Sequence, residues 1–201
     1  YLIYFMNKVF YMLDAVKKLI ATIEKKQHGL VPSVPKVCAE ALKLVTFISA
    51  CRKKEVKVLE VGTGYGYSAL WILQGILEAG VEGIIYTIEI NKERANTAAK
   101  FIREFGLDKH IKVMHGDAIK LIPIIKEEFD VVFLDGAKRE YYTYLKLVYP
   151  KLKKGGALLA HNVIGFKHIM KDFLDEIGKK DKWVTTIYAA DPEGLSISIK
   201  I

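Results

Sequence analysis

The sequence predicts an α/β fold in which helices cover both faces of a mostly parallel, seven-stranded sheet. Two observations predict it. From residue 56 onward, short apolar runs rich in β-branched residues alternate with helical patterns, which is typical of a doubly wound sheet. The runs at 184–188 and 195–201 flank the turn segment Ala-Asp-Pro-Glu-Gly at 190–194, so we expect a C-terminal antiparallel hairpin there.

At 201 residues the chain is long enough for one ordinary domain. We expect a single domain over 1–201, with an N-terminal helical cap over 1–50 and the α/β core over 56–201. The composition is 51% hydrophobic and 27% charged, which indicates a globular protein and excludes a disordered one.

Two extra helices are predicted before the sheet. Residues 2–26 place apolar side chains at helical spacing. This helix could cover a ligand site, join a partner subunit or pack on the sheet, and packing is the default. His28–Gly29 is predicted to end it. A proline-rich linker follows at 31–35, and a second helix is predicted from about Pro35, at its first position, to about Ala50.

The first core unit is a strand at 56–61, a turn at 62–66 and a helix from Ser68 to about Glu78. Asn91 is predicted to cap the helix at 91–105, and Gly106 is predicted to end it. The remaining expected elements are strands at 84–89, 111–114, 130–134 and 157–160, and helices at 91–105, 118–126, 139–152 and 166–177.

Location and redox chemistry follow from what the sequence lacks. No apolar run reaches the length of a membrane span, and the N-terminal residues show no basic leader or cleavage site, so we expect a cytoplasmic protein without a membrane partner.

Cys38 and Cys51 fall in one helical pattern three turns apart, where they cannot form a disulfide. We expect both to pack in the core.

The net charge of +8 would suit an RNA partner. The basic clusters at 52–54, 151–154 and 179–182 nevertheless fall at expected loops and helix ends. We therefore favour a Lys- and Glu-rich surface of the kind that thermophilic proteins have.

The glycine turn, Glu-Val-Gly-Thr-Gly-Tyr-Gly at 60–66, indicates a site for a nucleotide-like cofactor. It joins a buried strand to a helix whose free N–H groups can bind an anion. A nicotinamide fingerprint needs G-x-G-x-x-G, but here the third glycine is Gly66 and Tyr67 stands where that fingerprint has glycine. This spacing argues against a nicotinamide oxidoreductase.

A polar residue follows nearly every predicted parallel strand. In an open α/β sheet, ligands bind beyond these carboxyl ends. Any one such acid is commonly a helix cap, but a set of five indicates a binding edge. Glu89 suits a pair of ribose hydroxyls, and Asp117 with the Ala118 N–H suits the amino edge of an adenine. The residues are Glu60, Glu89, Asp117, Asp135 and His161–Asn162.

Four segments in this order resemble the metal-dependent O-methyltransferases, the group of catechol and caffeoyl-CoA O-methyltransferases. They are 58–69, Gly-Asp-Ala at 116–118, Phe-Leu-Asp-Gly-Ala-Lys at 133–138, and 155–163; the segment 191–195 is similar to the final hairpin of that family. The resemblance extends from about residue 31 to the C-terminus. It implies a Rossmann-like class I methyltransferase fold. The tRNA hydroxyuridine methyltransferase branch is about equally similar.

The resemblance implies roles for individual residues. Lys138 matches the proposed general base, and Asp135, His161 and Asn162 match the metal ligands. Tyr141 and Tyr142 could line the mouth of the site, although packing is favoured. The implied contacts with S-adenosyl-L-methionine are Glu60, Gly62, Ser68, Glu89, Asp117, Ala118 and Asp135.

His161 departs from the family, which usually has Asp at this position. Asp135 and Asn162 offer the oxygen ligands that Mg²⁺ prefers, whereas a histidine nitrogen favours Mn²⁺, Zn²⁺ or another transition metal. Alternatively no metal binds, or His161 is itself the general base. Metal binding is the favoured alternative.

We expect an enzyme that moves a methyl group from S-adenosylmethionine to an oxygen of a catechol-like or other hydroxylated acceptor. The alternatives are a tRNA hydroxyuridine O-methyltransferase and a non-catalytic cofactor-binding protein. The segment after Asn162 is short, so little lid is expected. The apolar N-terminal helix makes a homodimer plausible.

Overall fold

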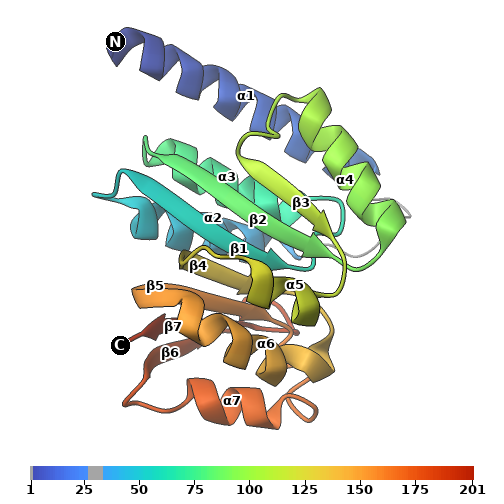
Figure 1. Ribbon diagram of the computed structural model, residues 1–201, viewed down its shortest axis with the longest axis vertical. Helices are drawn as coiled ribbons and strands as arrows, with labels where there is room; N and C mark the ends of the chain where they lie inside the picture. The colour runs from blue at the N-terminus through green and yellow to red at the C-terminus, as the bar shows by residue number, and fades with distance from the viewer. Residues whose placement is uncertain (1, 27–33) are drawn as a thin grey trace.

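The structure, a computed structural model, describes residues 2–26 and 34–201 (Figure 1). In this part of the chain seven strands form one sheet in the order β3-β2-β1-β4-β5-β7-β6. β1 to β5 pair in parallel, and β7 pairs antiparallel with both β5 and β6. The predicted fold class is therefore confirmed. The strands are β1 (Glu55–Val61), β2 (Glu82–Glu89), β3 (Ile111–His115), β4 (Phe129–Leu134), β5 (Leu152–His161), β6 (Trp183–Tyr188) and β7 (Leu195–Lys200).

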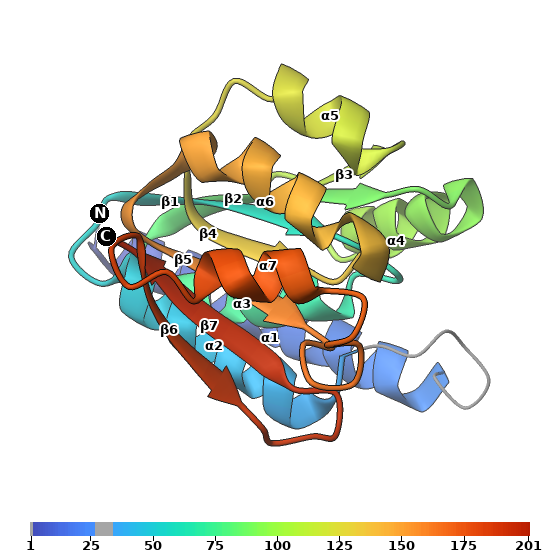
Figure 2. The same ribbon diagram turned by 90° about the horizontal axis from the view of Figure 1, so that it is seen from below.

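Helices cover both faces of the sheet and form two separate cores. Figure 2 shows α5 and α6 on one side and α1, α2 and α3 on the other. Side chains of α1 to α4 share one core with the sheet, and those of α5 to α7 share the second. The helices are α1 (Leu2–Lys26), α2 (Lys36–Ala50), α3 (Tyr67–Glu78), α4 (Lys92–Glu104), α5 (Ala118–Ile124), α6 (Tyr141–Val148) and α7 (Lys171–Ile177).

The strand order reverses between β1 and β4, which places their carboxyl ends side by side. Such a reversal opens a crevice for ligands in doubly wound sheets. Gly62 leaves β1 with φ +102°, a conformation that favours glycine. A Cβ atom on Gly62 would also lie 2.5 Å from the backbone oxygen of Asp135. A side chain at position 62 would therefore collide with the end of β4.

The predicted helix at 139–152 is wrong at both ends. A 3₁₀ turn at Lys138–Glu140 precedes α6, another at Tyr149–Lys151 follows it, and β5 already begins at Leu152. Gly155 lies inside this strand with φ +74°, at a register shift opposite β4. In the sequence, the Lys-Lys-Gly-Gly run at 153–156 resembles a loop, because the bulge interrupts the alternation of apolar residues that is typical of a strand.

The helix predicted at 166–177 begins only at Lys171. The preceding segment turns instead, because the N–H groups of Ile164 and Gly165 both bind the carbonyl of Glu193. Two smaller differences concern helix ends. Pro35 is the N-cap of α2 and not its first residue. α5 ends at Ile124, although the helix was predicted to continue to residue 126. The predicted caps at Asn91 and Gly106 are confirmed.

The N-terminal helix does pack within the protein, since Val16, Leu19 and Ile23 are buried, but it packs on helix α3 and not directly on the sheet. Of the two cysteines only Cys38 is buried. The prediction for Cys51 is wrong because Cys51 follows the last residue of α2 and faces solvent. The predicted stop at His28–Gly29 and the linker at 31–33 lie outside the described residues.

No helix in the described ranges is both long and apolar enough to cross a membrane.

Candidate active site

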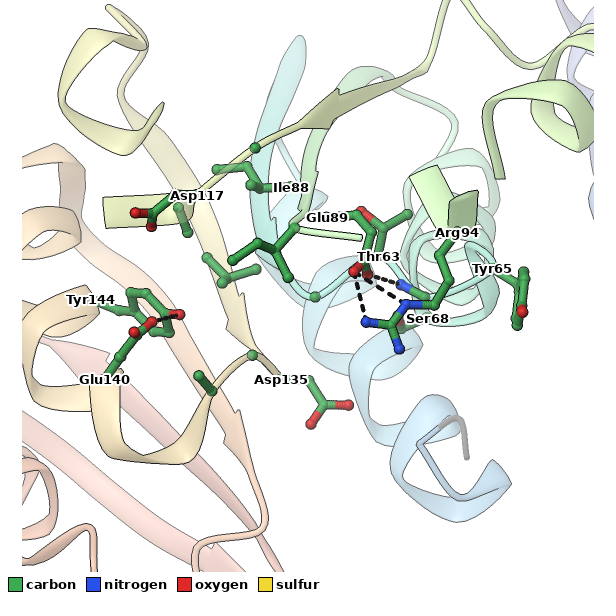
Figure 3. Close-up of a pocket in the computed structure, with 18 of the residues that line it drawn as sticks. Thr63, Tyr65, Ser68, Ile88, Glu89, Arg94, Asp117, Asp135, Glu140 and Tyr144 are labelled. Atoms are coloured by element: carbon green, nitrogen blue, oxygen red, sulfur yellow. Dashed lines mark hydrogen bonds and ion pairs between the residues drawn. The ribbon is translucent and has the colours of Figure 1, made fainter. Parts of the chain in front are cut away.

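A cavity of about 390 Å³ opens beyond the carboxyl ends of β1, β2 and β4 (Figure 3). Its volume lies within the range of about 300–1,000 Å³ that is typical of small-molecule sites. Six of the seven predicted cofactor contacts line it: Gly62, Ser68, Glu89, Asp117, Ala118 and Asp135.

Glu60, the seventh predicted contact, is fully buried and absent from the residues that line the cavity. Its two carboxylate oxygens accept hydrogen bonds from Ser68 Oγ and Thr87 Oγ1, each at 2.5 Å. Burial raises the pKa of Glu60 to about 7, although these two hydrogen bonds oppose the shift. Glu60 thus joins the first turn of α3 to β2 beneath the glycine turn.

Glu89 is buried at the end of β2 and lines the cavity. Oε2 accepts from the Gly64 N–H at 2.9 Å, which fixes the glycine turn against β2. Oε1 accepts from the Asn91 N–H at 2.9 Å and from Arg94 Nη2 at 2.9 Å. Figure 3 shows the Arg94 side chain reaching back to Glu89 across the cavity wall. A ribose that binds Glu89 would meet Arg94 as well.

Asp117 and Ala118 form the opposite wall. Asp117 caps α5, where its Oδ1 accepts from the Ile119 N–H at 2.9 Å. Beside them Tyr144 donates a hydrogen bond to Glu140, and both residues line the cavity (Figure 3).

Sequence reasoning missed Arg94, Glu140 and Tyr144. Arg94 lies in the first turn of the helix after β2, a position that faces back to the strand end. Glu140 and Tyr144 stand four residues apart, the spacing of neighbours on one helix face. The sequence shows the helix position of Arg94 and the spacing of Glu140 and Tyr144. Many pairs on helix surfaces have the same spacing, so it does not distinguish residues that line a cavity.

Asp135 forms the third wall and connects the cavity to a second cluster of polar side chains. Its Oδ1 lies 2.6 Å from Lys138 Nζ. Lys138 Nζ also donates to the hydroxyl of Tyr141 at 3.2 Å. Tyr141 is fully buried and donates to the backbone oxygens of Leu134 and His161, which confirms its predicted packing role. The buried hydroxyl of Tyr141 therefore helps to orient the Lys138 side chain through this hydrogen bond.

His161 ends β5 behind Asp135, with 6% of its side chain exposed. Its Nδ1 lies 3.7 Å from Asp135 Oδ1, and its Nε2 lies 3.4 Å from Asp191 Oδ2. Asp191 comes from the loop between β6 and β7 and accepts a hydrogen bond from the Cys38 thiol of α2 at 2.7 Å. Burial, together with that bond, raises the pKa of Cys38 to about 12.

Asn162 follows with φ +66°, and its amide nitrogen donates to Glu193 Oε2 at 3.2 Å. The structure thus brings Asp135, Lys138 and His161 together but turns the Asn162 amide nitrogen toward the loop between β6 and β7.

The predicted ligands Asp135, His161 and Asn162 do not fit a Mg²⁺ ion, which requires hard oxygen ligands. Asp135 Oδ1 already pairs with the Lys138 ammonium group, and His161 offers a nitrogen. The set contributes only one negative charge, and Lys138 neutralises it. These three residues therefore do not form a fitting site for Mg²⁺.

Comparisons with known proteins show which family the chain belongs to. The O-methyltransferase family model matches residues 10–188. A catechol O-methyltransferase from Niastella koreensis is 31% identical over 118 residues, which are 57% of this chain and 51% of that protein. A catechol O-methyltransferase from Mycobacterium tuberculosis is 29% identical over 109 residues, 54% of this chain and 48% of that protein. The chain thus spans about half the length of these relatives.

Two solved structures share the fold. The O-methyltransferase from Bacillus cereus in complex with SAH superposes with a TM-score of 0.73 at 21% identity, covering 94% of this chain and 90% of the other. TomG from Streptomyces achromogenes, in complex with SAM, superposes at 0.68 and 22% identity, covering 92% and 89%.

The chain belongs to the O-methyltransferase family, because the family model matches most of its length. Within that family it is similar to proteins named catechol O-methyltransferase.

Proposed function

We propose that this protein binds S-adenosylmethionine and transfers its methyl group to a hydroxyl oxygen of a second substrate. The observation that supports this most is the position of Asp135, which lines the cavity and also pairs with Lys138. The cavity end near Glu89 and Asp117 suits the adenosine, and the end near Asp135 suits the reacting groups.

The cofactor supplies a methyl group that its sulfonium already makes electrophilic. The acceptor oxygen forms the new bond to that carbon, the sulfur–carbon bond breaks, and its electron pair stays on sulfur. The chain must align the acceptor oxygen with this bond, and such positioning can lower the barrier by roughly 7–11 kcal/mol.

The hydroxyl proton leaves toward Lys138 Nζ, which acts as the general base when it enters the reaction neutral. The resulting ammonium group is stabilised by Asp135 Oδ1 at 2.6 Å and by the Tyr141 hydroxyl at 3.2 Å. Lys138 does not line the cavity but pairs with Asp135, which does, so the acceptor oxygen would lie at the edge of the cavity next to Asp135.

We propose a small hydroxylated molecule, of catechol-like type, as the acceptor. The relatives named catechol O-methyltransferase support this class.

The experiment is labelled methyl transfer from S-adenosylmethionine to a panel of vicinal-diol phenols, with bulk tRNA as a parallel arm. Transfer to the phenols supports the proposal, and transfer to tRNA alone would change the acceptor class. Tight cofactor binding without transfer to either pool would favour a non-catalytic binding protein.

A homodimer is also proposed, because Phe10 and Tyr11 of α1 are exposed. A monomer mass by light scattering would rule out this homodimer.

A further inference from the structure

Three side chains that can bind a metal meet beside the cavity, from three separate parts of the fold. Cys38 comes from the first turn of α2, His161 from the end of β5 and Asp191 from the loop between β6 and β7. Their ligand atoms all lie within 4.8 Å of one another. None of the three lines the cavity that we assign to the cofactor.

One atom of this cluster lacks a partner. His161 Nε2 is buried and forms no hydrogen bond within the described part of the chain. Asp191 Oδ2 lies at ion-pair distance, 3.4 Å, but not in hydrogen-bond geometry. A buried polar atom without a hydrogen bond costs roughly 1–3 kcal/mol. Its lone pair would be satisfied by a ligand placed between His161, Asp191 and Cys38.

Asp191 is held in place for such a ligand. Its Oδ1 accepts hydrogen bonds from the N–H groups of Glu193 at 2.7 Å and Gly194 at 2.9 Å. These two bonds fix the carboxylate so that Oδ2 faces Cys38 Sγ at 2.7 Å. The loop thus presents one oxygen to the cluster, with 8% of the Asp191 side chain exposed.

We propose that Cys38 Sγ, His161 Nε2 and Asp191 Oδ2 bind one transition-metal ion, best matched by Zn²⁺. Sulfur, imidazole nitrogen and carboxylate oxygen are the three ligand types of protein zinc sites. Three protein ligands leave a fourth position for water or another small ligand, as in zinc sites that are open to exchange.

The three ligand atoms lie within 4.8 Å of one another, so small shifts would let them share one ion. A tetrahedral Zn²⁺ with its usual bond lengths separates its ligand atoms by about 3.3–3.6 Å. The Nε2–Oδ2 distance of 3.4 Å already fits this range. The Sγ–Oδ2 distance of 2.7 Å must widen by less than about 1 Å as the ion replaces the thiol proton between the two atoms.

The other ring nitrogen of His161 connects this site to the catalytic pair. With Nε2 on the ion, Nδ1 bears the hydrogen and faces Asp135 Oδ1 at 3.7 Å. Metal-binding histidines commonly direct their second nitrogen to a carboxylate in this way. The ion would therefore fix the tautomer of His161 behind Asp135 and Lys138. This site differs from the predicted family set because it uses Cys38 and Asp191 in place of Asp135 and Asn162.

The test is metal binding by the full chain after treatment with a chelator, independent of any activity. Titration with Co²⁺ is expected to give one bound ion and a thiolate-to-cobalt charge-transfer band that Zn²⁺ removes. Cys38→Ser should abolish the band, and Asp191→Asn should weaken binding by more than the roughly 10–100-fold that an outer-shell change costs. Asp135→Asn should keep the band.

The matched control is Cys51→Ser, which changes the other cysteine of the chain, an exposed residue at the end of the same helix. Cys51→Ser should leave the band and the affinity unchanged. Because the chain has only two cysteines, this result assigns the sulfur ligand to Cys38. The assignment holds even if the Cys38→Ser variant does not fold. No band in the wild type, a band that survives Cys38→Ser, or binding lost in Asp135→Asn but kept in Asp191→Asn would overturn the proposal.

Discussion

Gly62 lies directly against Asp135, so that a Cβ atom on Gly62 would be 2.5 Å from the Asp135 backbone oxygen. The relationship joins the glycine turn after β1 to the end of β4. It also leaves the backbone of the turn free to approach a ligand, since no side chain stands between the turn and the strand.

The first prediction is that Gly62→Ala destabilises the fold strongly. A positive φ costs a residue other than glycine about 1–2 kcal/mol, and a buried collision costs about 1–3 kcal/mol more. Gly80→Ala is the matched control, because Gly80 has φ +70° and a Cβ atom on it would meet no atom within 4 Å. Urea denaturation should show the larger loss at Gly62. Equal losses at the two sites would mean that the contact with Asp135 has no energetic effect.

The second prediction concerns Lys138. Lys138→Met should reduce the rate of methyl transfer roughly 10²–10⁴-fold, the usual contribution of a general base. Cofactor affinity should not change, because Lys138 does not line the cavity. Single-turnover rates measure the first effect, and titration with the cofactor measures the second.

The control for this experiment is Lys146→Met, since Lys146 lies on α6 and its Nζ stands 4.7 Å from the centre of the Tyr142 ring. This variant should retain the wild-type rate. If Lys138→Met also kept the wild-type rate, Lys138 could not be the base.

The third prediction is that Glu89→Gln weakens the binding of S-adenosylmethionine. Hydrogen bonds to a charged group contribute about 1.5–3 kcal/mol, so the affinity should fall roughly 10- to 100-fold. Isothermal titration calorimetry measures the change. Glu93→Gln, a change at an exposed acid in the first turn of α4, should leave the affinity unchanged. An unchanged affinity in Glu89→Gln would remove Glu89 from the cofactor site.

The fourth prediction follows from the raised pKa of Glu60. In the folded protein this pKa is about 7, against 4.5 for the free side chain. The folded state therefore holds a proton that the unfolded state releases, and stability is lost as the pH rises from 4.5 through 7. Relative to Glu60→Gln, the wild type should lose roughly 3 kcal/mol of unfolding free energy over this range. Urea denaturation at several pH values, without cofactor, measures the difference. A constant difference between the two proteins would contradict it.

The sequence predicted most of the fold because each core strand is a short apolar run that ends in a polar residue. The same pattern predicted the edge of the sheet at which the cavity opens, and six predicted residues line this cavity. The errors fall where backbone contacts from distant loops replace local preference. Glu193 holds the chain after Asn162 out of a helix, and a bulge at Gly155 extends β5 toward its N-terminal end.

The contacts around His161 could not be predicted, because they join residues with no local relationship. Nothing near Cys38 indicates that its thiol meets Asp191, and a buried apolar helix position is equally typical of core packing. Glu60 shows a similar limit. Its place before the glycine turn suggested a cofactor contact, but Glu60 is fully buried and does not line the cavity.

The contact between Cys38 and Asp191 spans 153 positions of the chain. Closing a loop of this length costs roughly 4 kcal/mol of chain entropy. During synthesis, a growing chain that has emerged through Asp135, the residue after β4, already contains the glycine turn. It still lacks His161 and Asp191, so this part of the cavity is present before the cluster of Cys38, His161 and Asp191 can form.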